Sequence, residues 1–292
     1  MSTAVEELPQ ELTQEAPPQV IDSATLLRTC AKCMKGGTLL EEAPEEALRL
    51  WWEAEKARCA PLAGSLASPD ADWAEAIATH RAHRHAFYEE LVTSGYVHDY
   101  AQLLLESWVL PAFLPLVERV FEVQTQTEGI EALLRKIHQE QSAAGRADLM
   151  RQLTMALAVH AQADSACLDL HESLIDRSLV FYYGYFCDPW HLAGALFATE
   201  VLSPHQAAMI GAGLARLGYP PEDLHFIQAR SVTDDNDPRE WLQLFGPAME
   251  MKPVLRETVA QGIAACLETT ARYLDDLTRR AFPQPVAVAA AG

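Results

Sequence analysis

The feature that most constrains the fold is the spacing of the apolar side chains. From Asp22 to Arg280 they recur every three or four residues, in segments bounded by proline, glycine, serine or aspartate. This is the spacing of amphipathic α-helices. No stretch of several residues alternates between apolar and polar side chains, and the chain lacks the Asn-Gly and Asp-Gly pairs that favour hairpins. The sequence therefore predicts an all-α protein of about eight to ten helices.

Composition and helix-breaking residues divide the chain into four predicted segments. Residues 1–22 are acidic and proline-rich, which is typical of a disordered leader. Residues 23–72 are expected to form a helical extension that ends in a linker rich in proline, glycine and serine, over residues 60–72. Residues 73–282 are expected to form the main helical domain, and residues 283–292 a flexible tail.

Helix-capping residues set the expected boundaries inside the main domain. Trp73–Ser94 is expected to be one helix, closed by Gly95. Pro189 is expected to open a helix and Ser203-Pro204 to start the next one, which stops at Gly218. Val254–Arg280 is predicted to be one long final helix.

Charge and composition exclude several kinds of partner. The formal net charge of −19 and the pI of about 4.8 argue against nucleic acid and anionic membrane surfaces, which bind basic patches. No run of about 18 apolar residues occurs. Residues 1–19 lack the basic start and apolar middle of a secretory signal, so a cytoplasmic protein is expected.

The cysteines, the clustered histidines and one aromatic run are read as structural. The six cysteines are too sparse for a disulfide scaffold and are expected to be reduced thiols, with a redox or metal role for Cys30, Cys33 and Cys59 as the alternative. His80, His83 and His85 have no carboxylate partner in the sequence and are expected on a half-exposed helix. The aromatic run Phe181–Phe186 is expected to belong to the core, with a pocket wall as the alternative.

A lone carboxylate in an apolar helix marks the candidate site. Glu200 follows Ala193, Leu196 and Phe197 at the spacing of one helix face. A glutamate on such a face needs a proton, a cation or a metal, because an unpaired buried charge is costly. Glu140 likewise shares a face with Leu133 and Ile137. Carboxylates that point inward from separate helices are the arrangement that builds a carboxylate-bridged metal pair.

The stretches GALFATEVLSPHQAAMIGAGL (194–214) and LHFIQARSVTDDND (224–237) resemble the heme-oxygenase-like helical proteins. Within that superfamily they look closest to the non-heme diiron oxidases and to pyrroloquinoline-quinone synthase, a biosynthetic enzyme. The segments that begin at His85 and at Leu133 fit the same family pattern, so the resemblance covers about residues 73–280. It implies a heme-oxygenase-like bundle, often a homodimer, that oxidises a small molecule.

The resemblance also implies a set of metal ligands. Glu140 and Glu200 match two ligand glutamates, and Asp234 matches the aspartate of the third ligand helix, His-x-x-x-Asp-x-x-His. Arg230 and Asp237 stand where that motif has its histidines. Asp237 is therefore a possible metal ligand, with a capping residue before Pro238 as the alternative reading.

These departures leave two hypotheses open. The first is an oxidase or oxygenase with a dinuclear non-heme iron held by Glu140, Glu200, Asp234 and Asp237. Its metal-free version has Arg230 and His225 as catalytic residues that hold an anionic substrate. The second hypothesis is a non-catalytic protein of the same fold that binds a ligand or partners an enzyme, with Arg230 as a structural ion pair. The histidines to examine as replacement ligands are His138, His171, His191 and His225.

Overall fold

The computed structural model describes residues 22–34, 44–109, 153–157, 159, 171–224, 227 and 238–282. Within these residues the chain forms nine α-helices, one 3-10 helix and no strand, which confirms the all-α prediction. Their bounds are α1 (Ser23–Met34), α2 (Glu45–Ala67), α3 (Trp73–Thr79), α4 (Ala86–Ser94), α5 (Val97–Val109), α9 (Glu172–Phe186), α10 (Pro189–Arg216), η4 (Pro221–Leu224), α12 (Pro238–Met251) and α13 (Val254–Ala281).

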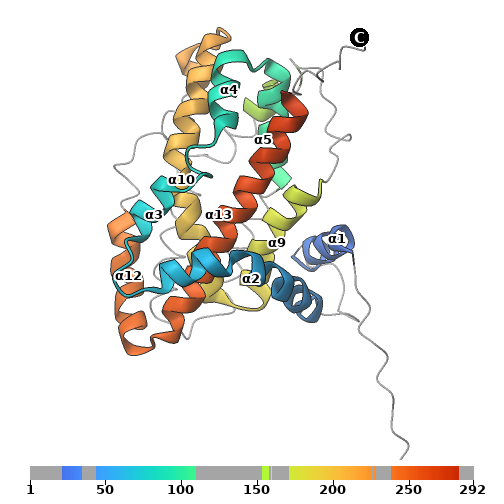
Figure 1. Cartoon of the computed structure of the whole chain (residues 1–292). Helices are drawn as coiled ribbons and strands as arrows, with labels where there is room; N and C mark the ends of the chain where they lie inside the picture. The colour runs from blue at the N-terminus through green and yellow to red at the C-terminus, as the bar shows by residue number, and fades with distance from the viewer. Residues whose placement is uncertain are drawn as a thin grey trace, which may run out of the picture.

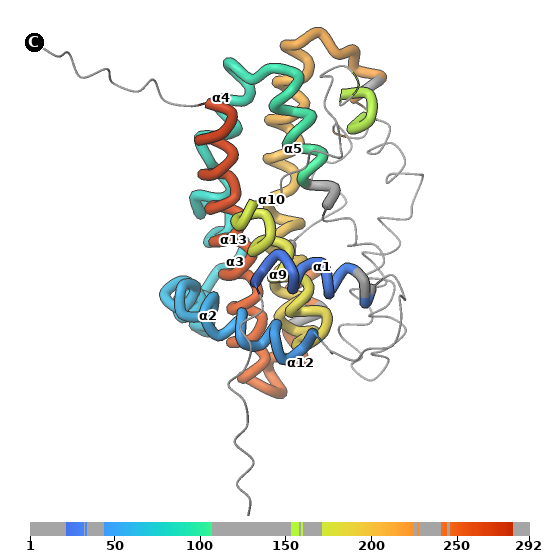
Figure 2. The backbone as a smooth tube through the Cα atoms, turned by 90° about the vertical axis from the view of Figure 1, so that its right-hand side faces the viewer, coloured from blue at the N-terminus to red at the C-terminus, as the bar shows by residue number. Residues whose placement is uncertain are grey.

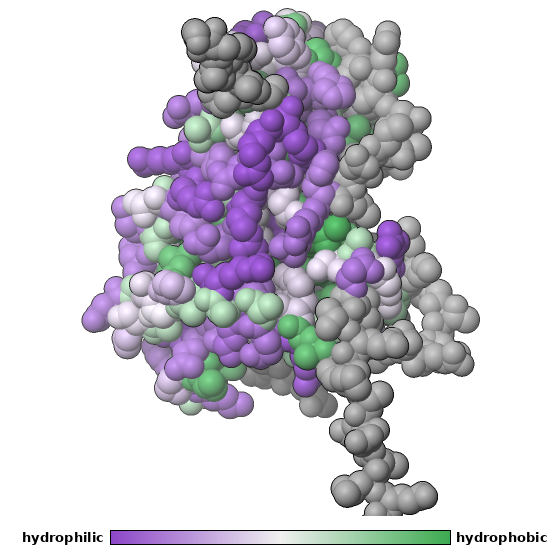
Figure 3. Space-filling view, turned by 45° about the vertical axis from the view of Figure 1, so that its right-hand side comes forward, coloured by the Kyte–Doolittle hydropathy of each residue, from purple (hydrophilic) through white to green (hydrophobic). Residues whose placement is uncertain are grey.

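Two long helices, α10 and α13, run side by side through the molecule (Figures 1 and 2). Helices α4 and α5 cover one end of this pair, and α2 and α12 lie at the other end. Helix α9 packs against both long helices, and α1 packs on α9. The face in Figure 3 is mostly hydrophilic, with apolar side chains in small groups. No helix of the described residues is long and apolar enough to cross a membrane.

Glycines allow α10 and α13 to touch backbone to backbone. A Cβ atom added at Gly194 would lie 2.1 Å from the carbonyl oxygen of Val259. A Cβ atom at Gly262 would lie 2.0 Å from the carbonyl oxygen of His191. Neither distance is possible for a real side chain, so only glycine fits at these two positions. The two contacts fix how α10 and α13 are rotated and shifted relative to each other.

The core has two apolar clusters along this helix pair. One gathers buried residues of α1, α2, α3, α9, α10, α12 and α13, including Trp52, Trp73 and Phe197. The other gathers residues of α4, α5, α9, α10 and α13, including Tyr88 and Tyr273. Phe181 and Tyr182 are buried in the first cluster, so the aromatic run is core as expected.

Two prolines expected to break helices do not. Helix α2 continues through Pro61 to Ala67, so much of the expected linker is helical. Helix α10 likewise continues through Pro204 instead of restarting there. A proline inside a helix removes one hydrogen bond and crowds the preceding turn. Buried residues on both sides of each proline hold these helices against the core and outweigh that local cost.

The prediction of one continuous helix over residues 73–94 was wrong, because two helices joined by a turn occupy this range. The chain leaves the helix at His80 and re-enters it at Ala86. His80 Nδ1 accepts a hydrogen bond from the Ala82 amide, and His85 Nδ1 accepts one from the Phe87 amide. The histidines thus satisfy the backbone of a turn instead of covering a helix face, and His85 is buried rather than half-exposed. Gly95 ends α4 as predicted.

Carboxylates in the core are matched by arginines. Glu106 is fully buried, and its two oxygens lie 2.8 and 3.2 Å from the two terminal nitrogens of Arg280. Glu55, which is 1% exposed, lies 2.7 Å from Arg272. Charge-assisted bonds of this kind compensate for the desolvation of the buried charge.

We expect Gly262→Ala to lower the free energy of unfolding by about 1–3 kcal/mol or more, because the new methyl group forces α10 and α13 apart. Gly64→Ala on α2 is the control, since a Cβ atom there meets nothing within 4 Å. It should be neutral or stabilise by up to about 1 kcal/mol, as alanine is the better helix former. Urea unfolding followed by circular dichroism measures both. Equal stability of the two variants would contradict the backbone contact.

Arg280→Met should cost about 3–5 kcal/mol, because it leaves the Glu106 carboxylate buried without its cation. The double variant Glu106→Leu/Arg280→Met should recover much of this loss, since no buried charge then remains. Arg279→Met is the matched control, because the Arg279 side chain is 71% exposed on the same helix. If Arg280→Met were as stable as the control, the pair would not compensate a buried charge.

Candidate functional site

Glu200 lies where the sequence places it, on a buried face of α10. Asp188 caps this helix by accepting hydrogen bonds from the Trp190 and His191 amides, and Pro189 occupies its first turn. Glu200 is 7% exposed, and Ala193, Leu196 and Phe197 on the same face are buried. Helix α10 therefore places the Glu200 carboxylate in the protein interior, among apolar side chains.

The other predicted site residues, Glu140, His225, Arg230, Asp234 and Asp237, lie outside the described residues. Glu200 is therefore the one predicted ligand that the structure places. Within the described part of the chain, no three histidine, cysteine, aspartate or glutamate side chains are grouped so that they could hold a metal ion. The ligand set stays a prediction.

His191 does not replace a missing ligand beside Glu200. The two residues are nine positions apart on α10, which is two and a half helical turns, so they point to opposite sides of the helix. His191 is 1% exposed and packs edge-on against Trp52 at 4.5 Å and Tyr183 at 4.9 Å between ring centroids. Burial lowers its pKa to about 3, so the ring is neutral at physiological pH.

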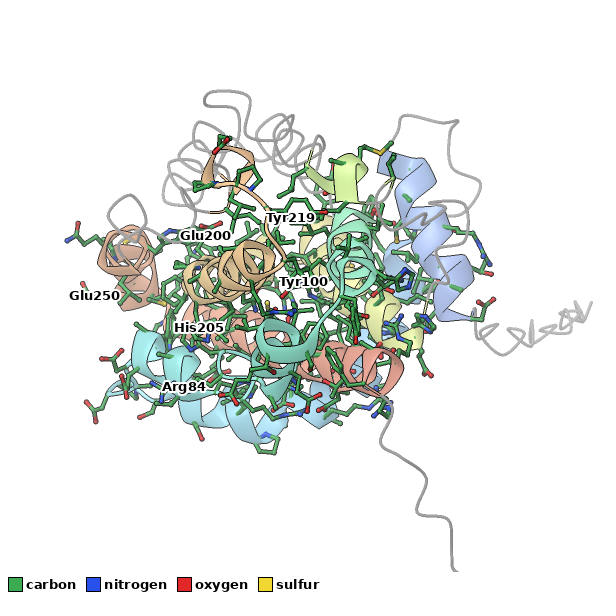
Figure 4. The ribbon with its side chains drawn as sticks, turned by 90° about the horizontal axis from the view of Figure 1, so that it is seen from above. Arg84, Tyr100, Glu200, His205, Tyr219 and Glu250 are labelled. Carbon is green, nitrogen blue, oxygen red and sulfur yellow. The ribbon has the colours of Figure 1, made fainter. Side chains whose placement is uncertain are left out.

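Figure 4 labels Glu200 and His205 on different sides of α10. His205 faces the turn between α3 and α4, where its ring stacks on that of His83 at 4.6 Å. In the same turn, His80 and His85 face Glu268 and Asp275 of α13 at 3.4 and 3.1 Å. Burial lowers the pKa of His80 and of His83. These contacts connect the turn to α10 and α13, and Glu200 takes part in none of them.

A groove of about 300 Å³ lies between α2 and α13. Small residues of α2 form one wall, with Trp52 at one end and Glu257 and Gln261 on the α13 side. Glu200 does not line this groove. Its charged residues, Lys56 and Glu257, are exposed. The groove is therefore separate from the predicted ligand site.

Arg177 is a residue of interest that sequence reasoning missed. It lies on α9 between Asp176 and Ser178, and its guanidinium carbon is 5.0 Å from the centre of the Tyr273 ring. Its Nε atom is buried without a hydrogen-bond partner, as is the hydroxyl of Tyr273. Burial raises the pKa of Tyr273 and of Tyr88, so both phenols stay protonated. The signal for Arg177 in the sequence was weak, because this residue directly follows the oppositely charged Asp176.

Comparison with known proteins supports the expected family. Residues 130–271 match the family model described as iron-containing redox enzyme. The matched segment contains the predicted ligands Glu140, Glu200 and Asp234. A search of proteins with curated descriptions gave no match. The match over residues 130–271 supports the heme-oxygenase-like helical superfamily that the sequence resembles.

Proposed function

We propose that the protein carries out an oxidation of a small molecule at a carboxylate-rich iron site that includes Glu200. The observation that supports the proposal is a buried carboxylate, 7% exposed, inside the segment that matches a redox-enzyme family and at a position that resembles a ligand glutamate of that family. A carboxylate inside a helical bundle needs a cation, and several carboxylates together suit a hard divalent metal.

The donors fit iron in charge but differ from the family in kind. Glu200, together with Glu140, Asp234 and Asp237, would present oxygen atoms only. When bound, iron supplies the electrons and the open positions that dioxygen chemistry needs. Glu200 would hold one negative charge in place on a helix fixed by the contacts at Gly194 and Gly262, so its position does not depend on a mobile loop.

Two further parts of the proposal concern the surroundings of the site. The buried residues beside Glu200, Leu196 and Phe197, exclude water from the face on which the carboxylate lies. Arg230 would lie one helical turn before Asp234 and add one positive charge to the carboxylate cluster. A metal-free site in which Arg230 holds the substrate, and a non-catalytic protein of this fold, are the outcomes that the next experiments separate from an iron enzyme.

Glu200→Gln should lower iron retention by about tenfold or more, because the amide keeps the shape of the side chain and loses its charge. The protein is loaded anaerobically with ferrous iron, desalted, and its iron content measured; absorbance is then followed on exposure to oxygen. A dinuclear site predicts about two irons per wild-type chain. Glu250→Gln is the control, since Glu250 is exposed and lies at the outer edge on α12 (Figure 4). Equal iron in both variants would exclude Glu200 as a ligand.

Arg230→His restores an imidazole at a family ligand position and should tighten iron retention by about tenfold or more. Arg58→His is the control, because Arg58 is 59% exposed on α2. Iron retained by the variant but not by the wild type would favour the metal-free reading of the natural protein. If neither protein retains iron, the carboxylates are not a metal site.

A further inference from the structure

A second charged position in the interior, Arg177, has no counter-charge in the part of the chain that the structure describes. The other core-facing arginines, Arg272 and Arg280, each lie 2.7–2.8 Å from a buried carboxylate oxygen. No carboxylate among the described residues forms an ion pair with Arg177. The adjacent Asp176 accepts a hydrogen bond from Trp51 at 3.2 Å and lies 3.7 Å from Arg272. Glu106, which lies near Tyr273, is held by Arg280.

Polar groups surround this guanidinium in an otherwise apolar region. Cys266, Thr270 and Tyr273 of α13 recur at the spacing of one helix face, and all three are buried. Arg177 lies over the ring of Tyr273, and its charge also acts on Cys266 and on Tyr88 of α4. The Nε of Arg177 and the hydroxyl of Tyr273 have no hydrogen-bond partner within 3.5 Å, and the Glu106 carboxylate lies near that hydroxyl. Buried donors of this kind usually have a partner.

The charge and the donors select the chemistry of that partner. One guanidinium carries one positive charge and donates in a planar fork that fits a carboxylate. A phosphate would bring about two negative charges and calls for more cations than the described residues offer here. The neighbouring residues of the same cluster, Leu157, Leu174 and Tyr88, are apolar or aromatic and buried. A carboxylate attached to an apolar body satisfies both conditions.

The polar face of α13 also leads towards Glu200. The thiol of Cys266 lies 3.6 Å from the hydroxyl of Thr199, the residue before Glu200 on α10. From Cys266 to Tyr273 the helix advances about 10 Å, at 1.5 Å per residue. The Cys266–Thr199 contact places the polar face of α13 against α10, one residue away from Glu200 in the sequence.

We propose that Arg177 and Tyr273 bind the carboxylate of an apolar monocarboxylate, which is the substrate class of this protein. Arg177 donates two N–H groups to the carboxylate and Tyr273 donates its hydroxyl. The assignment of this ligand as substrate rests on the function proposed above, whereas the binding itself does not require iron.

The test is calorimetric titration of the metal-free full-length protein with benzoate and with benzamide, which has the same shape and no charge. Hexanoate and hexanamide serve as a second pair. The wild type should bind each carboxylate at least tenfold more tightly than its amide. Arg177→Gln should weaken benzoate binding at least tenfold and change benzamide binding less than threefold. Arg177→Lys, which keeps the charge and loses the fork, and Tyr273→Phe should both fall between these limits.

Arg279→Gln is the matched control, because this side chain is 71% exposed on α13; it should bind benzoate like the wild type. Thermal melting by circular dichroism checks that each variant is folded. If Arg177→Gln does not fold, the wild-type comparison of acid with amide and the Tyr273→Phe variant still decide the question. Equal binding of benzoate and benzamide by the wild type, or unchanged benzoate binding in Arg177→Gln, would overturn the proposal. Tighter Arg177-dependent binding of inorganic phosphate would overturn the carboxylate assignment.

Iron retention by Arg177→Gln, measured by anaerobic loading, should equal that of the wild type. The two proposals can therefore fail separately. Arg177-dependent benzoate binding without iron retention would refute the iron site alone. Iron retention without benzoate binding would refute the carboxylate site alone.

Discussion

The close contact between α10 and α13 is the constraint on which the rest of the described structure depends. At Gly194 and Gly262 the helices meet through backbone atoms, which leaves no room for a side chain. This close backbone contact fixes how each helix is rotated about its axis, because any other rotation would place a side chain between the two backbones. That rotation sets Glu200 on one buried side of α10 and turns the polar face of α13 at Cys266, Thr270 and Tyr273 towards α9. The functional proposals therefore follow from one helix contact.

The buried charged side chains differ in whether a group of opposite charge lies beside them. Glu55 and Glu106 each have an arginine at 2.7–2.8 Å, and their burial is compensated inside the protein. Among the described residues, Arg177 has no carboxylate partner and lies over the face of the Tyr273 ring, an interaction that leaves its buried Nε without a hydrogen bond. Glu200 is proposed as a metal ligand from its place in the sequence pattern and its burial. The lack of a carboxylate beside Arg177, within the described part of the chain, is the basis of the anion site proposed there.

Local sequence signals failed where tertiary packing opposed them. Pro61 and Pro204 are poor helix residues, yet both lie inside helices whose flanking turns are buried. The reverse happened at residues 80–85, where a good helical pattern is interrupted. There the histidine side chains find backbone amides within the turn and carboxylates on α13, which a continuous helix would not allow. Propensity is a weak preference, and contacts between distant segments override it.

The sequence by itself determined the fold class, the long helix that ends near Arg280, and the burial of Glu200, because each follows from the spacing of apolar residues along one helix. It also indicated the superfamily, through the order of segments from Glu140 to Asp237. The tertiary structure alone decided which helices touch, and that Arg177 has no ion pair among the described residues whereas Arg272 and Arg280 do. Those facts depend on residues more than 50 positions apart, such as Arg177 and Tyr273, whose proximity no local periodicity encodes.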